Sequence, residues 1–433
     1  MDGWSTEAAT DVNTSSFINE GIYNLIDNDD FKIVFVDPVR LLSSSYSRFR
    51  VSASSYYSRP FHPSRKNSTA GSAKQPCVSS GSKKRKRNSI SKTHELNERE
   101  KAAEKRHQQA KPLLLKAHSA LLGATWLLSS LDSMIKDEDV LEPDEGAAFE
   151  NDFIQLGNLW KAPLFEISLS HEGQSWFQES SGTCPVERTS IQVFNNIISN
   201  DLDNEMEVEF SSNQYILPRK SCFFMSDLRW INSLIPVHSD HGFNLIVIDP
   251  PWENASASQK AIYSTLPNRY FLSLPVNQLA HTEGSLVALW VTNREKFRIF
   301  VEKELFPAWG VTQITSCYWL KVKTDGSLIS EMDLFHHRPY ECLLLGYING
   351  KDEYDASTSP LRYPKNGEVI ISIPGAYSRK PPILKFLSDY IPGKKPPNCI
   401  DLFARELQGG WTSWGNEPLR FQDSRYFINR SGG

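Results

Sequence analysis

The sequence of 433 residues has few cysteines, and none of its six cysteines forms a Cys-x-x-Cys pair. This scarcity argues against a disulfide scaffold or a zinc finger and is typical of reduced core thiols in an intracellular protein. No basic stretch followed by an apolar run opens the chain, so we do not expect secretion. The most apolar stretch, residues 113–135, contains Lys116, His118 and Asp132 and is therefore a poor membrane span.

The chain also has little net charge, because 47 basic residues nearly balance 51 acidic ones and leave a formal charge of −4. Taken at face value, this balance argues against a nucleic-acid-binding protein. The charge is unevenly placed, however, since no Asp or Glu occurs from Pro38 to His94, a segment rich in Ser, Lys and Arg. Such a composition buries too little apolar surface to offset chain entropy, and we expect residues 60–93 to be a disordered basic linker.

The linker contains a run of basic residues, Lys83-Lys84-Arg85-Lys86-Arg87. One interpretation is a solvated patch whose charges repel one another. The other is a nuclear-import signal that also attracts phosphate groups, an attraction that weakens steeply with added salt. On the second interpretation we expect a nuclear protein.

The pattern along the chain predicts five segments. A long helix is indicated first by Glu-to-Lys pairs three and four residues apart and then by apolar residues at helical spacing up to Ile135. A small mixed domain follows, in which short apolar runs alternate with Ser, Asn and Gly. The predicted boundaries are an N-terminal segment over 1–59, the linker over 60–93, the helix over 94–138, the mixed domain over 139–219 and a larger domain over 220–430.

The larger domain shows short apolar runs that alternate with amphipathic stretches. This alternation predicts an α/β fold with a largely parallel sheet covered on both faces. In such sheets ligands bind at the carboxyl ends of the strands. The expected strands lie within Asn244–Asp249, Leu286–Val291, Gln313–Val322, Cys342–Tyr347, Val369–Ile373 and Cys399–Phe403.

A tetrapeptide with chemical potential, Asp249-Pro250-Pro251-Trp252, directly follows the apolar run Leu245–Ile248. Two consecutive prolines fix φ and remove two backbone donors, which predicts a rigid turn with outward carbonyls. A carboxylate, a fixed carbonyl and an aromatic face would then lie together, as the exocyclic amine of a nucleobase requires. The amine would donate to Asp249 and the Pro250 carbonyl, while the base stacks on Trp252 with roughly 1–3 kcal/mol.

This arrangement predicts transfer of a methyl group to the amine of adenine. That nitrogen is a poor nucleophile, because its lone pair is delocalised into the ring. Two acceptors that pull its hydrogens out of the ring plane would return electron density for in-line attack on an activated methyl, and most of the rate would come from positioning. The alternative is an ordinary Asp-Pro turn with a core tryptophan, which the position of the tetrapeptide after an apolar run disfavours.

With these residues, the chain resembles the Asp-Pro-Pro-Trp adenine-N6 methyltransferases, the MT-A70-like group, over about residues 220–430. The block that begins at Leu402 and runs to Glu417, together with Glu253-Asn254, is most similar to the methyltransferase-like protein four branch. The further blocks are Trp290-Val291-Thr292-Asn293-Arg294, Tyr318-Trp319-Leu320-Lys321, Pro339-Tyr340-Glu341, Ser378-Arg379-Lys380-Pro381, and Leu402-Phe403-Ala404-Arg405 through Trp411-Thr412-Ser413-Trp414-Gly415-Asn416-Glu417.

The resemblance implies a Rossmann-like fold that uses S-adenosylmethionine as methyl donor, with the catalytic tetrapeptide placed before the main cofactor-binding block. It also implies that Lys380 meets the methionine carboxylate, and that Asp227 and Leu228 read the cofactor's adenine. The catalytic residues would be Asp249, Pro250, Pro251 and Trp252. The cofactor-binding residues would be Asp227, Leu228, Asp249, Lys380, Arg405, Asn416 and Glu417.

For the substrate, the resemblance places an acid, Glu341, near the target base and Tyr263 in a loop that closes over the site. The full set of expected substrate-binding residues is Trp252, Glu253, Asn254, Tyr263, Trp319 and Glu341. Two positions depart from the family pattern. Glu406-Leu407-Gln408 stands where many relatives have Pro-His-Asn, and Glu417 replaces a more usual Gln, which keeps an acceptor but removes a donor.

The branch implies N6 methylation of 2′-O-methyladenosine in U2 spliceosomal small nuclear RNA. DNA adenine and a catalytically silent RNA-binding scaffold are the alternatives. His336-His337 with Glu341 is either a partial metal site or a set of ordinary polar residues, and we expect no metal because further ligands are lacking at suitable spacing. We also expect no membrane partner and a monomer, in which the long N-terminal region packs on the catalytic domain.

Overall fold

The computed structural model describes residues 21–28, 31–58, 96–137, 151–158, 162–171, 187–253, 265–335, 337–349 and 362–430. The predicted linker over 60–93, with its basic run, lies outside these residues. So do Asn254, Tyr263 and His336, which the sequence analysis had singled out.

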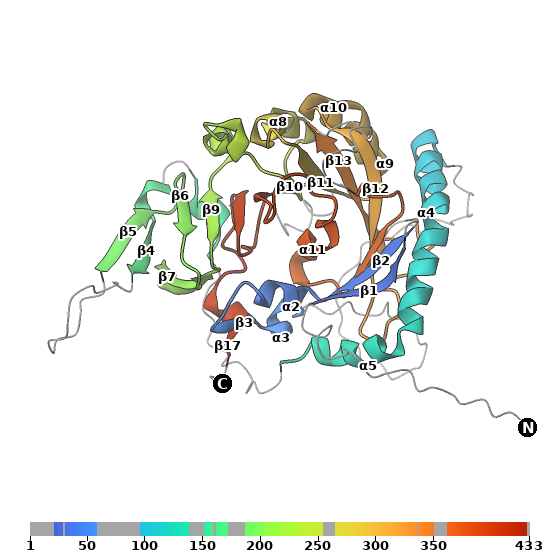
Figure 1. The fold of residues 1–433 in the computed structure, drawn as a ribbon, viewed down its shortest axis with the longest axis horizontal. Helices are drawn as coiled ribbons and strands as arrows, with labels where there is room; N and C mark the ends of the chain where they lie inside the picture. Colours follow the sequence, from blue (N-terminus) through green and yellow to red (C-terminus); the bar gives the residue numbers. More distant parts are fainter. Residues whose placement is uncertain are drawn as a thin grey trace, which may run out of the picture.

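A large central sheet dominates the described part of the chain (Figure 1). Neighbouring strands are parallel except at β1/β2, β12/β13, β13/β11 and β9/β6, which confirms the predicted α/β class with a mostly parallel sheet. In spatial order the strands are β1 (Ile22–Asp27), β2 (Lys32–Val36), β14 (Val369–Ser372), β12 (Thr312–Lys321), β13 (Tyr340–Ile348), β11 (Ser285–Val291), β10 (Leu245–Ile248), β15 (Cys399–Leu402), β16 (Trp411–Gly415), β9 (Ser221–Met225) and β6 (Ile197–Asn200).

The middle of the sheet is covered on both faces, which explains the unbroken apolar run in β10. Ile246 and Ile248 belong to one hydrophobic cluster, and Leu245 and Val247 belong to another. Burying each such side chain stabilises the fold by about 1.5–3 kcal/mol. The first face is covered by α8 (Val276–Leu279), α9 (Glu295–Phe300), a π-helical turn (Val301–Leu305) and α10 (Phe306–Trp309), and the second by α11 (Leu384–Leu387).

Residues from near the N-terminus complete one edge of this sheet. β2 runs parallel to β14, with Ile33 opposite Val369, and all five residues of β2 are buried. The chain then forms α2 (Pro38–Ser43), β3 (Phe49–Val51) and α3 (Ala53–Tyr56), and β3 pairs with β17 (Phe427–Asn429) near the other end of the chain. Residues 22–56 are thus joined by strand pairing to the domain expected over 220–430.

The helical segment expected over 94–138 consists of two helices, α4 (Glu98–Gly123) and α5 (Thr125–Met134), which meet at Ala124. α4 begins with a capping box, in which the Asn97 side chain accepts from the Glu100 N–H and the Glu100 carboxylate accepts from the Asn97 N–H. Its apolar face packs against the outer strands of the sheet. The buried residues of that face are Ala110, Leu114, Ala117 and Leu121.

A second, antiparallel sheet is formed by residues that lie between the helices and β9 in the sequence. It contains β5 (Glu187–Gln192), β4 (Glu166–His171), β7 (Met206–Phe210) and β8 (Asn213–Leu217) in that order. Phe153 of α6 (Phe153–Leu156) packs on its Phe210 and Tyr215 rings. The same core includes Phe223 of β9, so this sheet is continuous in packing with the central one.

Four of the cysteines fall within the described ranges, and all four are free thiols, with Cys317, Cys342 and Cys399 buried and Cys222 half-buried. None of the helices in the described ranges combines the length and the apolar character that a membrane span requires.

The end of α5 is fastened to the N-terminal segment by one buried carboxylate. Asp137, with 2% of its side chain exposed, accepts from the hydroxyls of Ser52 and Ser54 and from the backbone N–H groups of Ala53 and Ser54, over 2.7–3.0 Å. Because charge-assisted bonds to a buried carboxylate are strong, this contact holds the helical segment against α3.

We predict that Asp137→Asn lowers the free energy of unfolding by about 2 kcal/mol, because one acceptor oxygen becomes a donor and leaves buried donors unpaired. Urea unfolding followed by circular dichroism measures the change. The matched control is Asp132→Asn, which removes only an exposed pair with Lys136 and is expected to cost less than about 0.5 kcal/mol. Equal losses in the two variants would contradict the prediction.

Candidate functional site

A cavity of about 980 Å³ opens at the carboxyl ends of the central strands. Asp249 follows β10, Thr292 follows β11 and Asn416 follows β16, and all three line it. Because parallel strands end at the same edge of a sheet, segments far apart in the sequence meet there. The expected site residues at the cavity wall are Asp249, Pro250, Pro251, Trp252, Glu341, Lys380, Arg405, Asn416 and Glu417.

At one side of the cavity, a lysine lies between two carboxylates. Lys380 Nζ is 3.2 Å from Asp249 Oδ2 and 3.4 Å from Glu341 Oε2. Lys321, at the end of β12, donates to the other oxygen of Glu341. The three elements that carry this cluster are the β10 turn, the β12–β13 hairpin and the segment before α11.

The cluster fixes the charges of its members. Burial favours the neutral form of Glu341, but the ammonium groups of Lys321 and Lys380 outweigh it and hold the pKa of this carboxyl at about 2. Burial likewise opposes the charge of Lys380, and the carboxylates of Asp249 and Glu341 outweigh that effect and raise the pKa of Lys380. Glu341 and Lys380 therefore remain charged at neutral pH.

The turn that carries Asp249 is held rigid from within. The backbone N–H of Trp252 donates to the Pro250 carbonyl at 2.8 Å, and the backbone N–H of Leu266 donates to the Pro251 carbonyl at 3.0 Å. Beyond the turn, Glu253 Oε1 accepts from the backbone N–H of Asn268 at 3.2 Å. A carbonyl oxygen has two lone pairs, so Pro250 keeps one acceptor position after bonding to Trp252.

Residues 243–417 match the family model MT-A70. This match covers the tetrapeptide, the lysine–carboxylate cluster and the strand ends around the cavity. The chain is therefore similar to the MT-A70 family over this region. Over 240 residues it is 38% identical to a mouse protein named N(6)-adenine-specific methyltransferase METTL4. The aligned residues make up 55% of this chain and 50% of that protein.

Two further relatives carry names that differ in the nucleic acid. An N6-methyladenosine RNA methyltransferase MTA1 of Pyricularia oryzae is 30% identical over 224 residues, or 50% of this chain and 57% of that protein. A DNA N6-methyl methyltransferase of Caenorhabditis elegans is 32% identical over 220 residues, or 49% and 56%. The chain spans about half the length of the curated relatives it matches. The expected resemblance to the MT-A70-like group and its METTL4 branch is confirmed.

Within the region that matches the MT-A70 model, Trp252 lies differently from the expectation of an open stacking face. Its ring is 5% exposed, packs on the Phe297 ring at 5.1 Å and meets the Phe271 ring edge-on at 5.3 Å. Its indole N–H donates to the Trp290 carbonyl at 2.9 Å. These contacts correct the sequence interpretation, because in this arrangement the indole anchors the turn from the core.

Trp319 is also a core residue, which corrects its expected place at the substrate. Its side chain is 1% exposed and donates to Ser372 Oγ at 2.7 Å. Its ring lies 4.3 Å from Lys321 Nζ, a distance at which a cation and an aromatic face attract each other. Trp319 therefore supports the lysine that faces Glu341.

Asp227 and Leu228 follow β9, whose end pairs with the end of β16 next to Asn416. Leu228 is partly buried against the core. The Asp227 carboxylate caps the 3₁₀-helix Leu228–Leu234 and accepts from the backbone and guanidinium of Arg229, which hold the pKa of Asp227 below its ordinary value. Both residues thus lie near the edge of the sheet where the cavity opens, but neither is among the residues that line it, and the carboxylate is engaged with its own helix.

Glu406, where the chain departs from the family pattern, has an ion-pair partner in the structure. Its carboxylate forms an ion pair with Arg379, whose guanidinium also lies 4.1 Å from the Tyr56 ring of α3 and 4.2 Å from the Phe421 ring. Next to it, Arg405 donates to the carbonyls of Tyr377 and Ser378. Glu406 therefore helps to hold the segment that carries Lys380. Glu417 in turn accepts from Arg420 at 2.8 Å.

Sequence reasoning assigned no role to several side chains at or beside the cavity, among them Lys321, Asn293 and Asp401. Lys321 was quoted only within a family block, and Asn293, which donates to the Tyr340 carbonyl, was likewise noted without a role. Asp401 of β15 lies beside the turn, where burial and then the Asp249 carboxylate raise the pKa of Asp401 well above its ordinary value. Because Asp401 lies within an apolar run, the sequence gave no sign that its carboxyl group would lie close to Asp249.

As for the metal expectation, no group of three metal-ligating His, Cys, Asp or Glu side chains gathers within the described ranges. His337 lines the cavity, while its neighbour His336 lies outside the described residues.

We predict that Lys321→Met raises the pKa of Glu341 from about 2, because one of the two ammonium groups that oppose the effect of burial is lost. Carboxyl-carbon NMR titration measures it, and Lys323→Met, two residues further on, is the control. In the wild type, the contribution of Glu341 to stability is complete above the ordinary pKa of 4.5 and is lost as pH falls toward about 2. An unchanged titration of Glu341 in Lys321→Met would contradict this account.

Proposed function

We propose that this protein is an S-adenosylmethionine-dependent N6-adenine methyltransferase that acts on RNA. The observation that carries the proposal is the placement of Asp249 on a rigid turn at the wall of a large cavity, 3.2 Å from the buried ammonium of Lys380. The relatives of the MT-A70 domain support it, because their names describe adenine N6 methylation.

The residues around the cavity fit the proposed methyl donor. Lys380, with 15% of its side chain exposed, supplies a largely buried cation for the donor's carboxylate. Asn416 and Glu417, at the end of β16, offer amide and carboxylate groups for the hydroxyls of its ribose. Once bound, the donor supplies a methyl group on a positively charged sulfur, which is open to attack by a weak nucleophile. The volume of about 980 Å³ is at the upper end of the usual range for ligand pockets.

The chain's own residues then orient the adenine amine. Asp249 and the remaining lone pair of the Pro250 carbonyl accept its two hydrogens, which directs the nitrogen lone pair toward the methyl group. As the nitrogen bonds to the methyl carbon, the carbon–sulfur bond would break with its electron pair left on sulfur, and the nitrogen would lose one of its two protons. The Trp252 indole, fixed by its bond to the Trp290 carbonyl, prevents the turn from yielding. Rate enhancement in this scheme comes from pre-formed geometry, so that small displacements of Asp249 have large effects.

For the substrate, we propose 2′-O-methyladenosine in U2 spliceosomal small nuclear RNA. The resemblance to the methyltransferase-like protein four branch implies this choice, and the names of the METTL4 relatives support N6-adenine methylation. An RNA target also accords with the name of the Pyricularia oryzae relative, whereas the name of the Caenorhabditis elegans relative keeps DNA adenine as the second candidate.

We further propose a nuclear protein that acts as a monomer. The basic run Lys83–Arg87 supports nuclear import. The monomer is supported by β1, β2 and α4, which extend the central sheet beyond β14 and pack on its outer strands within one chain.

We predict that Asp249→Asn lowers kcat for methyl transfer by at least about a hundredfold, because the amide no longer provides a pure acceptor for the amine. Radiolabelled methyl incorporation measures the rate, and thermal unfolding checks that the variant is folded. The control is Asp240→Asn, which changes a surface aspartate before β10 and is expected to leave the rate unchanged. Turnover retained by Asp249→Asn would refute the mechanism, and a wild type that does not bind S-adenosylmethionine in calorimetry would favour a scaffold.

For the substrate, we predict that an RNA oligomer with internal 2′-O-methyladenosine accepts methyl groups with a higher kcat/KM than the matched adenosine RNA or the matched DNA. Mass spectrometry of digested products identifies N6 methylation. A preference for DNA would overturn the substrate proposal while leaving the methyltransferase assignment intact.

A further inference from the structure

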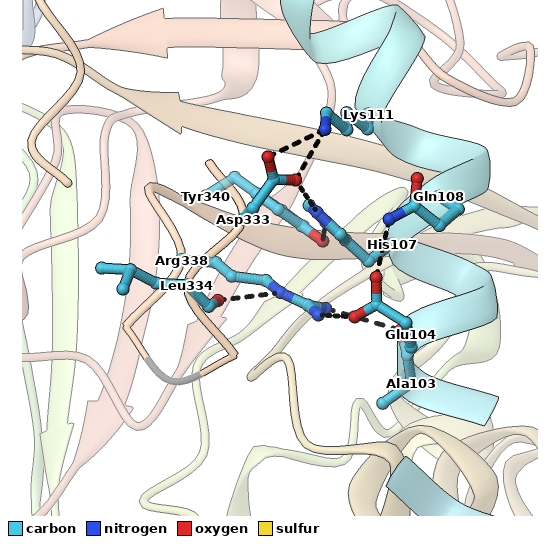
Figure 2. A network of polar contacts seen from close by, with 9 residues as sticks. All are labelled: Ala103, Glu104, His107, Gln108, Lys111, Asp333, Leu334, Arg338 and Tyr340. Carbon is cyan, nitrogen blue, oxygen red and sulfur yellow. Dashed lines mark hydrogen bonds and ion pairs between the residues drawn. The ribbon is translucent and has the colours of Figure 1, made fainter. Parts of the chain in front are cut away.

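One face of α4 holds the hairpin loop that joins β12 to β13 (Figure 2). Glu104, His107 and Lys111 project from successive turns of the helix and contact the loop at Asp333 and Arg338. The two ends of this loop carry Lys321 and Glu341, and its residues Phe335, His337 and Arg338 line the cavity. α4 therefore contacts a wall of the site.

His107 is the centre of these contacts. It is 1% exposed, and its ring stacks on that of Tyr340 with an angle of 8° between the planes. Nδ1 is 3.0 Å from the Tyr340 hydroxyl, and Nε2 is 3.3 Å from Asp333 Oδ1. Lys111 and His107 hold the pKa of Asp333 below its ordinary value, so the carboxylate accepts from Nε2–H. Nδ1 of the neutral ring then accepts from the Tyr340 hydroxyl.

Arg338 closes the network from the loop side. Its guanidinium forms an ion pair with Glu104 at 2.7 Å and donates to the Leu334 carbonyl at 3.2 Å, and the residue is 8% exposed. Tyr340 also interacts with Arg338 through its side chain. The phenol is thus held between an imidazole acceptor on the helix and a guanidinium donor on the loop.

These restraints act on the residue next to Glu341. The Tyr340 carbonyl accepts from Asn293, and the Lys321 N–H donates to the Pro339 carbonyl at 2.8 Å. Successive side chains of a strand point to opposite faces, so anchoring the Tyr340 ring on one side fixes the direction of the Glu341 carboxylate on the other. That carboxylate is the partner of Lys380, which in turn contacts Asp249.

We propose that His107 is a positioning residue for methyl transfer, which acts by accepting from the Tyr340 hydroxyl and so fixing the carboxylate of Glu341 opposite Lys380. The inference rests on the proposed function and adds to it a residue that lies outside the residues matched by the family model. α4 thereby becomes part of the machinery that holds the site in shape, rather than a cover for the sheet edge alone.

A pH dependence follows from the direction of the Tyr340 bond. The groups that face His107 are Glu104 and Lys111 on α4 and Asp333, Arg338 and Tyr340 on the hairpin. Burial and then the Arg338 charge lower the pKa of His107 from 6.5, so the ring is neutral at pH 7. Protonation at lower pH converts Nδ1 to a donor and removes the bond from Tyr340.

The test compares full-length His107→Phe with wild type, using S-adenosylmethionine and the best oligomer from the substrate comparison. Phenylalanine keeps a stacked ring but removes both hydrogen bonds. The expected result is a fall in kcat of about tenfold or more with the KM for S-adenosylmethionine changed by less than about twofold. In the double variant His107→Phe/Tyr340→Phe, kcat is expected to fall no further than in Tyr340→Phe alone. In His107→Phe, the fall of kcat at low pH that protonation of His107 causes is expected to disappear.

The matched control is His118→Phe, which makes the same chemical change on the same helix. His118 also contacts this hairpin, through the Gly326 carbonyl at 2.9 Å, but at the end away from the cavity. We expect wild-type kcat for it. Equal losses in the two variants, or fully additive losses in the double variant, would overturn the proposal.

Amide hydrogen exchange gives a readout that needs no turnover. Residues 339–342 are expected to exchange faster in His107→Phe than in wild type or His118→Phe. Unchanged protection there refutes the positioning role even if the protein methylates RNA. Conversely, faster exchange in a protein without methyltransferase activity would reject the proposed function and retain the link between His107 and the hairpin.

Discussion

The contact of Lys380 with Asp249 and Glu341 is the constraint on which the rest of the site depends. A buried ammonium group is costly unless carboxylates surround it, and each carboxylate here comes from a different element. Lys321 adds a second cation, so that the charges nearly compensate within the cavity wall. The β10 turn, the β12–β13 hairpin and the segment before α11 must therefore keep their relative positions for the charges to stay paired.

Those positions are maintained by parts of the chain outside residues 243–417, the region that matches the MT-A70 model. α4 holds the hairpin through His107 and Arg338, and Arg106 of the same helix pairs with Glu295 and Glu302 beside the β11 end of the cavity. At a separate contact, Tyr56 of α3 packs on Arg379, the neighbour of Lys380. The N-terminal elements thus contact segments that carry site residues at two separate places, and a single chain supplies both contacts.

Some site properties followed from local sequence. The apolar run Leu245–Ile248 can only be a strand buried on both faces, and the two prolines after Asp249 require a rigid turn. The α/β alternation followed in the same way, whereas the place of Asn416 and Glu417 at the site was implied only by the family resemblance. The orientation of Trp252 did not follow, because an aromatic residue in a turn can face either a ligand or the core. Its neighbours Phe271 and Phe297, which decide the matter, lie in later elements.

By itself the sequence determined the class of fold, the tetrapeptide and its place after a strand, since these depend on residues adjacent in the chain. Only the tertiary structure decided that β1 and β2 complete the sheet edge, that Lys321 joins Lys380 at Glu341, and that His107 meets Tyr340 across 233 positions. The near-neutral overall charge carried no information about the site for the same reason. What matters there is which opposite charges are brought together out of water, and that is set by folding rather than by composition.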